Sequence, residues 1–454
     1  MTVLAAPPAP LAAHQLLVLL LQLATLLVVA LCLGRVAERL GMPAIVGELL
    51  TGVLLGPSLL GQLAPGFAHW LLPPVPTQMN LLDAVGQLGV LLLVGVTGAH
   101  LDIGAIRRRG GTAVGVSLAG LLLPLGLGIL AGSLLPRTLI PGHTPRGVFA
   151  LFLGVAMCVS AIPVIAKTLS DMRLLHRDVG QLTLAAGMVD DAVGWFLLSV
   201  VSAAATVGIS GFRVTRSVLY LIGFVLVATV LGGPLVRAAM RFASRAQEPG
   251  PSIAVAVVVV LLGAATTQSL GMEPVFGAFV CGILVGTARR QDQARLAPLR
   301  TVVLSVLAPL FLATAGLRMD LTGLRHPTVA VAAVVVLAIA ILGKFAGAYL
   351  GARLSRLTNW EGLALGAGMN ARGVVEVIVA MTGLRLGVLD TSTYTIIVLV
   401  AIVTSLMAPP LLRLATARIR QSDEELLREA AHDALAGLKP AQPVQPVQPA
   451  SAEA

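Results

Sequence analysis

Two adjacent aspartates, Asp190 and Asp191, stand in the middle of a long apolar run, within the stretch GMVDDAVGW at 187–195. They are the only charged residues between Asp178 and Arg213. A carboxylate at the centre of a membrane-spanning helix costs about 2.5–3.5 kcal/mol on insertion scales, and neighbouring carboxylates also repel each other. Ionisable groups kept at such a cost usually mark an ion or proton pathway. The alternative is a buried ion pair that only fixes helix packing.

Further charged residues lie inside apolar runs. Lys344, in ILGKFAGAY, is flanked by small residues that allow close helix approach. It is either a structural counter-ion or a group that loses its proton when a cation arrives, and both readings stay open. Arg372 stays protonated, so a structural role beside free carbonyls or beside Glu376, four residues on, is favoured. Glu48 is better explained as an interfacial residue than as a functional one.

These residue types suit the exchange of a monovalent cation for protons. A hard monovalent cation prefers oxygen ligands such as carboxylate, hydroxyl, carbonyl and water. A carboxylate in a partly dry site can also carry a proton. A site that holds either a cation or protons, never both, is enough to exchange them. The sequence offers no nucleophile–base pair, metal cluster or phosphate-binding glycine loop, so we expect neither an enzyme nor a cofactor.

The elements that position these residues must be membrane helices. The chain is 57% hydrophobic and 11% charged, with a mean hydropathy of +0.94. Its net charge of +10 comes from basic residues in short loops, where they set membrane orientation and do not indicate a nucleic-acid partner. The three cysteines fall inside apolar stretches and the seven histidines show no metal-ligand spacing. We expect an all-α polytopic membrane protein.

Apolar windows separated by Gly/Pro turns or basic clusters predict about thirteen spans. Their approximate limits are 14–33, 43–60, 81–99, 112–135, 147–169, 179–206, 215–240, 252–270, 273–288, 300–318, 327–352, 361–384 and 393–415. Basic residues are concentrated in the loops on the side of the C-terminus, which predicts a plasma-membrane protein with its C-terminus in the cytoplasm and its N-terminus outside. The first span has full spanning length and no basic residue before it, which favours a retained helix over a cleaved signal peptide.

An internal repeat relates the two halves of the chain. GELLTGVLLG at 47–56 and GAFVCGILVG at 277–286 share glycines at the same spacing. Further on, Gly98, Asp102 and Arg107 match Gly316, Asp320 and Arg325. Repeats of six spans separated by one span must have inverted topology, which is the signature of alternating-access transporters.

The repeat pairs the fifth span with the twelfth, and both are expected to be broken helices. The fifth carries Ser160 and Pro163 in CVSAIPVIAK, and the twelfth carries Asn370, Arg372 and Glu376 in GAGMNARGVVEV. Their half-helix ends would present free amides and carbonyls at the membrane centre.

The predicted domain organisation follows from the spans and the repeat. Residues 1–13 form an extracytoplasmic tail and residues 14–415 form the transmembrane domain, with repeats at 14–206 and 252–415 joined by a linking helix at 215–240. Residues 416–454 form a cytoplasmic tail. This tail begins with a short helix whose capping box pairs Ser422 with Glu425 and ends in a Pro-rich disordered segment.

The chain resembles the second monovalent cation:proton antiporter family, which includes sodium/proton and potassium/proton exchangers. The resemblance covers about 14–415 and is carried by SAIPVIAKTLSDMRLLHRDVGQLTLAAGMVDDAVGW at 160–195, GKFAGAYLGAR at 343–353 and GMNARGVVEVIVA at 368–380. It implies the sodium/proton antiporter fold: a homodimer with a six-helix core, two crossed discontinuous helices and a separate dimerisation domain.

The resemblance also implies roles for the charged residues. Asp191 resembles the carboxylate that binds cation and proton in turn, and Asp190 resembles the neighbour that pairs with Lys344. Arg372 and Glu376 match the polar motif of the second crossed helix. A pair of aspartates with this lysine is similar to the electrogenic members. The potassium-efflux branch usually carries a nucleotide-binding regulatory domain that these 454 residues do not include, and the choice between Na⁺ and K⁺ stays open.

Two other functions compete with this reading. A sodium-coupled organic-anion symporter could use a similar inverted-repeat scaffold, but it has less need of a buried lysine beside paired carboxylates. A membrane-bound sensor would need a cytosolic output domain, for which the residues after the last span offer little room.

Overall fold

The computed structural model describes residues 11–435, apart from positions 74, 102, 208–210 and 289–293. Asp102 of the repeat, the Pro-rich segment from 436 onward and most of the predicted N-terminal tail therefore lie outside the described residues, as does the side chain of Arg107. Within the described part, every regular element is a helix.

The α-helices follow one another along the whole described chain. They are α1 (Ala13–Arg39), α2 (Ala44–Leu55), α3 (Leu60–Leu63), α4 (Pro65–Leu71), α5 (Pro76–Ala99), α6 (Ile103–Leu134), α7 (Arg146–Cys158), α8 (Ile162–Asp171), α9 (Asp178–Val207), α10 (Gly211–Val227), α11 (Gly233–Ala243), α12 (Gly250–Ser269), α13 (Pro274–Ala288), α14 (Ala297–Val302), α15 (Ala308–Gly316), α16 (Pro327–Leu354), α17 (Asn359–Met369), α18 (Val374–Arg385), α19 (Thr391–Thr416) and α20 (Asp423–Leu435). Single π-helical segments, Ala228–Gly232 and Val303–Leu307, join α10 to α11 and α14 to α15.

Each of the thirteen predicted spans overlaps one of these helices or helix pairs. Among the described residues, eleven segments are long and apolar enough to cross a membrane, and the bent pair α17–α18 raises the number to twelve. The remaining helix, α13, is apolar but shorter than a full span. Most of its side chains are buried against other helices, and short or irregular segments are tolerated at membrane depth where protein surrounds them. The expected number of thirteen is therefore approximate.

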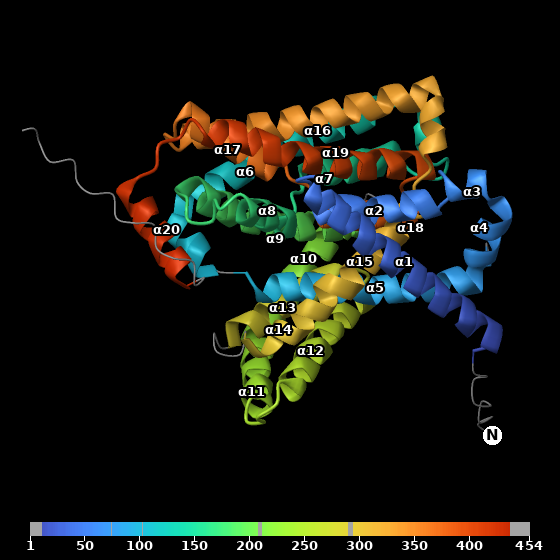
Figure 1. Ribbon diagram of the computed structural model, residues 1–454, viewed down its shortest axis with the longest axis horizontal. Helices are drawn as coiled ribbons and strands as arrows, with labels where there is room; N and C mark the ends of the chain where they lie inside the picture. Colours follow the sequence, from blue (N-terminus) through green and yellow to red (C-terminus); the bar gives the residue numbers. More distant parts are fainter. Residues whose placement is uncertain (1–10, 74, 102, 208–210, 289–293, 436–454) are drawn as a thin grey trace, which may run out of the picture.

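The helices pack in two groups, which we call the site bundle and the scaffold bundle. The site bundle consists of α6, α7, α8, α9, α16, α17, α18 and α19, and the scaffold bundle consists of α1, α2, α5, α12, α13 and α15. Figure 1 shows α16, α17 and α19 along one side of the molecule and α5, α12 and α13 on the other. The extensive helix contacts fall within each bundle, and the contacts between the bundles are smaller.

The glycines matched in the repeat lie at matching helix crossings. Gly52 and Gly316 lie where α2 crosses α15, and a Cβ on either would overlap the backbone of the other helix. Gly98 and Gly282 lie in the same way where α5 crosses α13. Because only glycine permits so close an approach of two backbones, the repeated spacing records two equivalent helix crossings.

The helix corners that precede these crossings also match. α1 and α12 are both followed directly by the sequence Leu-Gly-Met, and the glycines Gly41 and Gly271 both have φ +75°. In each corner the N–H of the following methionine donates to a carbonyl in the last helical turn at 2.9 Å. Glycine is favoured here because an L side chain is strained in the left-handed conformation. The two corners place α2 and α13 in equivalent positions.

Candidate functional site

Two broken helices meet at the centre of the site bundle. The first breaks between the end of α7 at Cys158 and the start of α8 at Ile162, and the second breaks between α17 and α18. The two breaks touch, because the N–H of Ala161 donates to the carbonyl of Ala371 at 3.2 Å. Ser160 Oγ also donates to the carbonyl of Met369, the last residue of α17, at 2.7 Å. The expected pair of broken helices is therefore present, and they cross at their breaks.

Pro163 occupies the first turn of α8, so the helix breaks just before this residue and not at it. Proline suits this position because the first amides of a helix have no intrahelical acceptor, and the fixed φ of proline is already helical.

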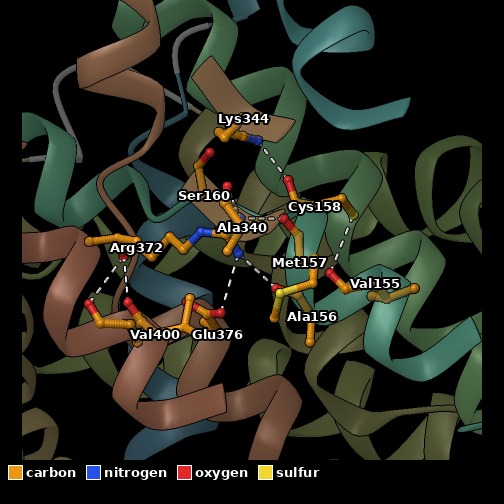
Figure 2. Close-up of polar contacts among 12 residues, drawn as sticks. Val155, Ala156, Met157, Cys158, Ser160, Ala340, Lys344, Arg372, Glu376 and Val400 are labelled. Carbon is orange, nitrogen blue, oxygen red and sulfur yellow. Dashed lines mark hydrogen bonds and ion pairs between the residues drawn. The ribbon is translucent and has the colours of Figure 1, made fainter. Parts of the chain in front are cut away.

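The breaks leave the last carbonyls of α7 without helical partners, and two cations bind them. Lys344 Nζ on α16 donates to the carbonyl of Cys158 at 2.6 Å. Arg372 in the second break donates to the carbonyls of Ala156, at 2.9 Å, and Met157. Figure 2 shows both side chains directed at this helix end. A helix C-terminus carries partial negative charge, so cations at this place both satisfy orphan acceptors and oppose that charge.

Each of these cations also forms an ion pair with a carboxylate. Lys344 Nζ lies 2.5 Å from Asp190 Oδ2, and both side chains are fully buried. Ser117 Oγ donates to the other oxygen of Asp190 at 3.4 Å. Arg372 lies 3.2 Å from Glu376 Oε1, one helical turn further along the chain.

Asp191 is fully buried, and neither of its carboxylate oxygens has a hydrogen-bond or ion-pair partner among the described residues. The backbone N–H of Ile162, at the start of α8, approaches this carboxylate without reaching hydrogen-bond geometry. α9 therefore directs its two aspartates differently. Asp190 meets a cation, whereas Asp191 faces the positively polarised start of α8.

The charges of the five buried ionisable residues around the two breaks do not balance. Three carboxylates, on Asp190, Asp191 and Glu376, stand against two cations, on Lys344 and Arg372. The two cations form ion pairs with Asp190 and Glu376, which leaves Asp191 as the carboxylate without a compensating charge. An unpaired buried charge is strongly unfavourable, so this arrangement calls for one added monovalent positive charge, either a proton or a metal cation.

Other polar atoms near the second break also lack partners. Both amide atoms of Asn370 and the Oε2 atom of Glu376 are buried without a hydrogen bond in the described residues. The two oxygen atoms add unsatisfied acceptors to the same region of the site bundle, and the Asn370 nitrogen adds an unsatisfied donor. The described residues contain no group of three or more His, Cys, Asp or Glu side chains placed to hold a resident metal ion.

The structure brings together the predicted residues of the fifth, sixth, eleventh and twelfth spans. Glu48 is half-buried on α2 of the scaffold bundle, outside this cluster. Two hydroxyls were missed: Ser117 on α6, which bonds Asp190, and Ser405 on α19, which donates to the backbone carbonyl of Arg372. Small hydroxyl residues are common at every membrane helix interface, so the sequence carried no signal to distinguish these two.

Comparison with known proteins identifies the family of this chain. The family model described as sodium/hydrogen exchanger, transmembrane, matches residues 24–416. The chain belongs to the sodium/hydrogen exchanger family. The predicted resemblance to cation:proton antiporters is thereby confirmed at the level of the family.

Individual exchangers match over most of the chain. Cation/H⁺ antiporter 17 from Arabidopsis thaliana is 31% identical over 402 residues, which cover 88% of this chain and 48% of the plant protein. The Na⁺/H⁺ antiporter NhaS4 from Synechocystis is 29% identical over 400 residues, which cover 88% of this chain and 97% of the cyanobacterial protein. The chain thus spans about half the length of the plant relatives that it matches.

A solved structure shares the fold. The sodium proton antiporter MjNhaP1 from Methanocaldococcus jannaschii superimposes with a TM-score of 0.66 over 89% of this chain and 97% of the other, at 17% identity. The predicted all-helical sodium/proton antiporter fold of the single chain is confirmed.

Proposed function

We propose that this chain exchanges a monovalent cation, Na⁺ or K⁺, for protons across the membrane by alternating access, with Asp191 binding the cation and the proton in turn. The observation that carries the proposal is the uncompensated charge of this one buried carboxylate. Family membership supports the proposal, as do the antiporter names of the plant and cyanobacterial relatives.

Coupling follows from the cost of moving an unpaired charge. With a proton or a cation on Asp191, the buried charges of the site balance. With neither, the site carries a net negative charge in a medium where unpaired ions are strongly disfavoured. The loaded forms therefore change their orientation in the membrane far more readily than the empty form does. Because the two ligands compete for the same oxygens, the inward passage of one is tied to the outward passage of the other.

The neighbouring residues hold this carboxylate in place. Asp190 and Lys344 form an ion pair that fixes α9 against α16 and against the end of α7. Arg372 and Glu376 join the two breaks, because the arginine binds α7 while the glutamate lies in the first turn of α18. Ser160 and Asn370 supply oxygen atoms at the crossing.

The proposal also covers the oligomeric state, the membrane orientation and the repeats of the chain. We propose a plasma-membrane homodimer with its C-terminus in the cytoplasm and its N-terminus outside, as the distribution of basic loop residues indicates. Its transmembrane domain at 14–415 would contain inverted repeats at 14–206 and 252–415, joined by the linking helix at 215–240. Equivalent helix crossings and corners in the two halves support this division. The alternative of an organic-anion symporter receives no support from the family match.

Exchange in proteoliposomes tests the function. Purified protein reconstituted with an acidic lumen should release protons when Na⁺ or K⁺ is added outside, and Asp191→Asn should abolish this flux. Asp83→Asn is the matched control, because Asp83 pairs with Arg318 in the scaffold bundle, away from the breaks. Flux from the Asp191→Asn protein at the rate of the unchanged protein would overturn the proposal.

A further inference from the structure

A polar cavity opens between the two bundles at one end of α8. It has a volume of about 340 Å³ and is bounded by the α1–α2 corner, the last turn of α8 and the end of α19. Lys167 lies there between two carboxylates, 3.3 Å from Glu38 of the scaffold bundle and 3.3 Å from Asp171 of its own helix. The hydroxyl of Thr168, which also lines the cavity, is buried without a hydrogen bond. By the proposed orientation, this cavity faces the cytoplasm.

The repeat predicts an equivalent place on the other side of the membrane. The partner of the α1–α2 corner is the α12–α13 corner, with its matching glycine at 271. The partner of α8 is α18, which is the second half of the other broken helix, and the partner of α19 is α9. The equivalent place therefore lies between the start of α13, the end of α18 and α9.

A tight ion pair occupies that place. Arg385, the last residue of α18, donates to both oxygens of Glu273, at 2.9 and 3.1 Å. The Glu273 side chain is only 5% exposed, although Glu273 directly precedes α13 in the scaffold bundle. Arg385 also donates to Gln87 of α5 at 3.3 Å. Ser202 of α9 and Thr382 of α18 place hydroxyl groups beside the same carboxylate.

The two equivalent places therefore differ in a way that alternating access requires. One is a polar cavity of about 340 Å³ whose ion pairs are half-exposed on both partners, and at the other an ion pair covers a carboxylate that is only 5% exposed, although its arginine is 42% exposed. In an inverted-repeat transporter, the open path on one side and the closed path on the other exchange roles when the bundles move.

Resting on the proposed function, we propose that Glu273 and Arg385 form the external latch of the transporter. The pair ties the second broken helix to the scaffold bundle and keeps the external path to the site closed while the cytoplasmic cavity is open. This ion pair must break when the site bundle moves to open the site to the outside. The latch is thus a conformational element and does not bind the transported ion.

Thiol labelling from outside tests the latch. Ser202→Cys is introduced after the natural cysteines, Cys32, Cys158 and Cys281, are replaced by alanine. Intact cells are treated with a membrane-impermeant maleimide. The thiol should be protected in this parent protein and should react about ten-fold faster after Glu273→Gln, because the ion pair no longer holds the bundles together. Arg385→Gln breaks the same pair from the other side and should give the same increase.

Two controls separate a latch from general loosening. Exchanging the two charges, Glu273→Arg with Arg385→Glu, should restore protection. Asp83→Asn breaks the Asp83–Arg318 pair, which is internal to the scaffold bundle and lies on the same predicted side, so it should leave the labelling rate unchanged. Unchanged labelling after Glu273→Gln, an equal increase after Asp83→Asn, or full labelling of the parent protein would each overturn the latch.

Proton flux of the parent protein in proteoliposomes is measured separately. Loss of exchange by the parent protein argues against the proposed function, whereas the labelling pattern alone decides the latch.

Discussion

The buried pair of Asp190 and Lys344 allows a quantitative prediction. Lys344→Met keeps the length of the side chain but leaves Asp190 as a second unpaired carboxylate in a fully buried site. Removing one partner of a buried ion pair costs about 3–5 kcal/mol, because the remaining charge has no compensation. Asp190→Asn should cost a similar amount, since the buried lysine then has only neutral acceptors, such as the Cys158 carbonyl, and no opposite charge.

The double variant distinguishes a pair from two separate effects. Replacing both charges removes the buried ions together and leaves mainly an orphaned carbonyl, which costs about 1–3 kcal/mol. The costs of the two single substitutions sum to about 6–10 kcal/mol. We therefore expect a coupling energy of at least about 3 kcal/mol in the double-mutant cycle. The half-exposed pair of Lys167 and Asp171 is the matched control, with an expected coupling below about 0.5 kcal/mol.

The assay is reversible unfolding of the purified protein in mixed micelles, followed by tryptophan fluorescence. The free energy of unfolding is obtained for the unchanged protein, both single variants and the double variant. A coupling below about 1 kcal/mol, close to the average for polar contacts between membrane helices, would refute the reasoning that this pair is a tightly held buried ion pair.

Three further predictions follow from other contacts. Lys344→Gln should alter the transport current on a solid-supported membrane if this lysine releases a proton during exchange, and an unchanged current would show that it acts only as a counter-ion. Gly282→Val should abolish the recovery of monodisperse protein, because its side chain would overlap the α5 backbone, whereas Gly223→Ala should not, since nothing lies within 4 Å of its Cβ; equal recovery of both would contradict the crossing. Glu425→Ala should increase hydrogen exchange in α20, because Glu425 both completes the capping box and bonds Arg177 at 3.1 Å, and unchanged exchange would show that these contacts do not hold the helix.

Much of the fold could be predicted because the apolar runs that must cross the membrane are visible in the sequence. Long apolar runs must be helical in a membrane, since each backbone polar group needs a partner within its own segment. The repeated glycines marked the crossings at Gly52 and Gly282, where no side chain fits. The short span at 273–288 was also predictable and matches α13, but its apolar sequence does not reveal how completely neighbouring helices enclose it.

The site was predictable as a set of residues but not as a geometry. Charges at membrane depth identified Asp190, Asp191, Lys344, Arg372 and Glu376. The sequence could not show that Lys344 and Arg372 both bind the end of α7, because those acceptors are backbone carbonyls freed only by the break.

The ion pair of Glu273 and Arg385, which joins the two bundles, could not be predicted from the sequence for a different reason. Glu273 and Arg385 lie at the ends of spans, where charged residues are usual and solvent normally surrounds them. Only the packing of α13 against α5 and α9 buries the carboxylate and makes the pair distinctive.

Proton release on cation binding tests the central claim most directly. Purified protein in a weakly buffered detergent solution should release protons when Na⁺ or K⁺ is added, because the cation displaces the proton held by Asp191. The Asp191→Asn protein should release none, and its unfolding is measured alongside to confirm that it is folded. Equal proton release from the two proteins would contradict the claim that this carboxylate holds the proton and the cation in turn.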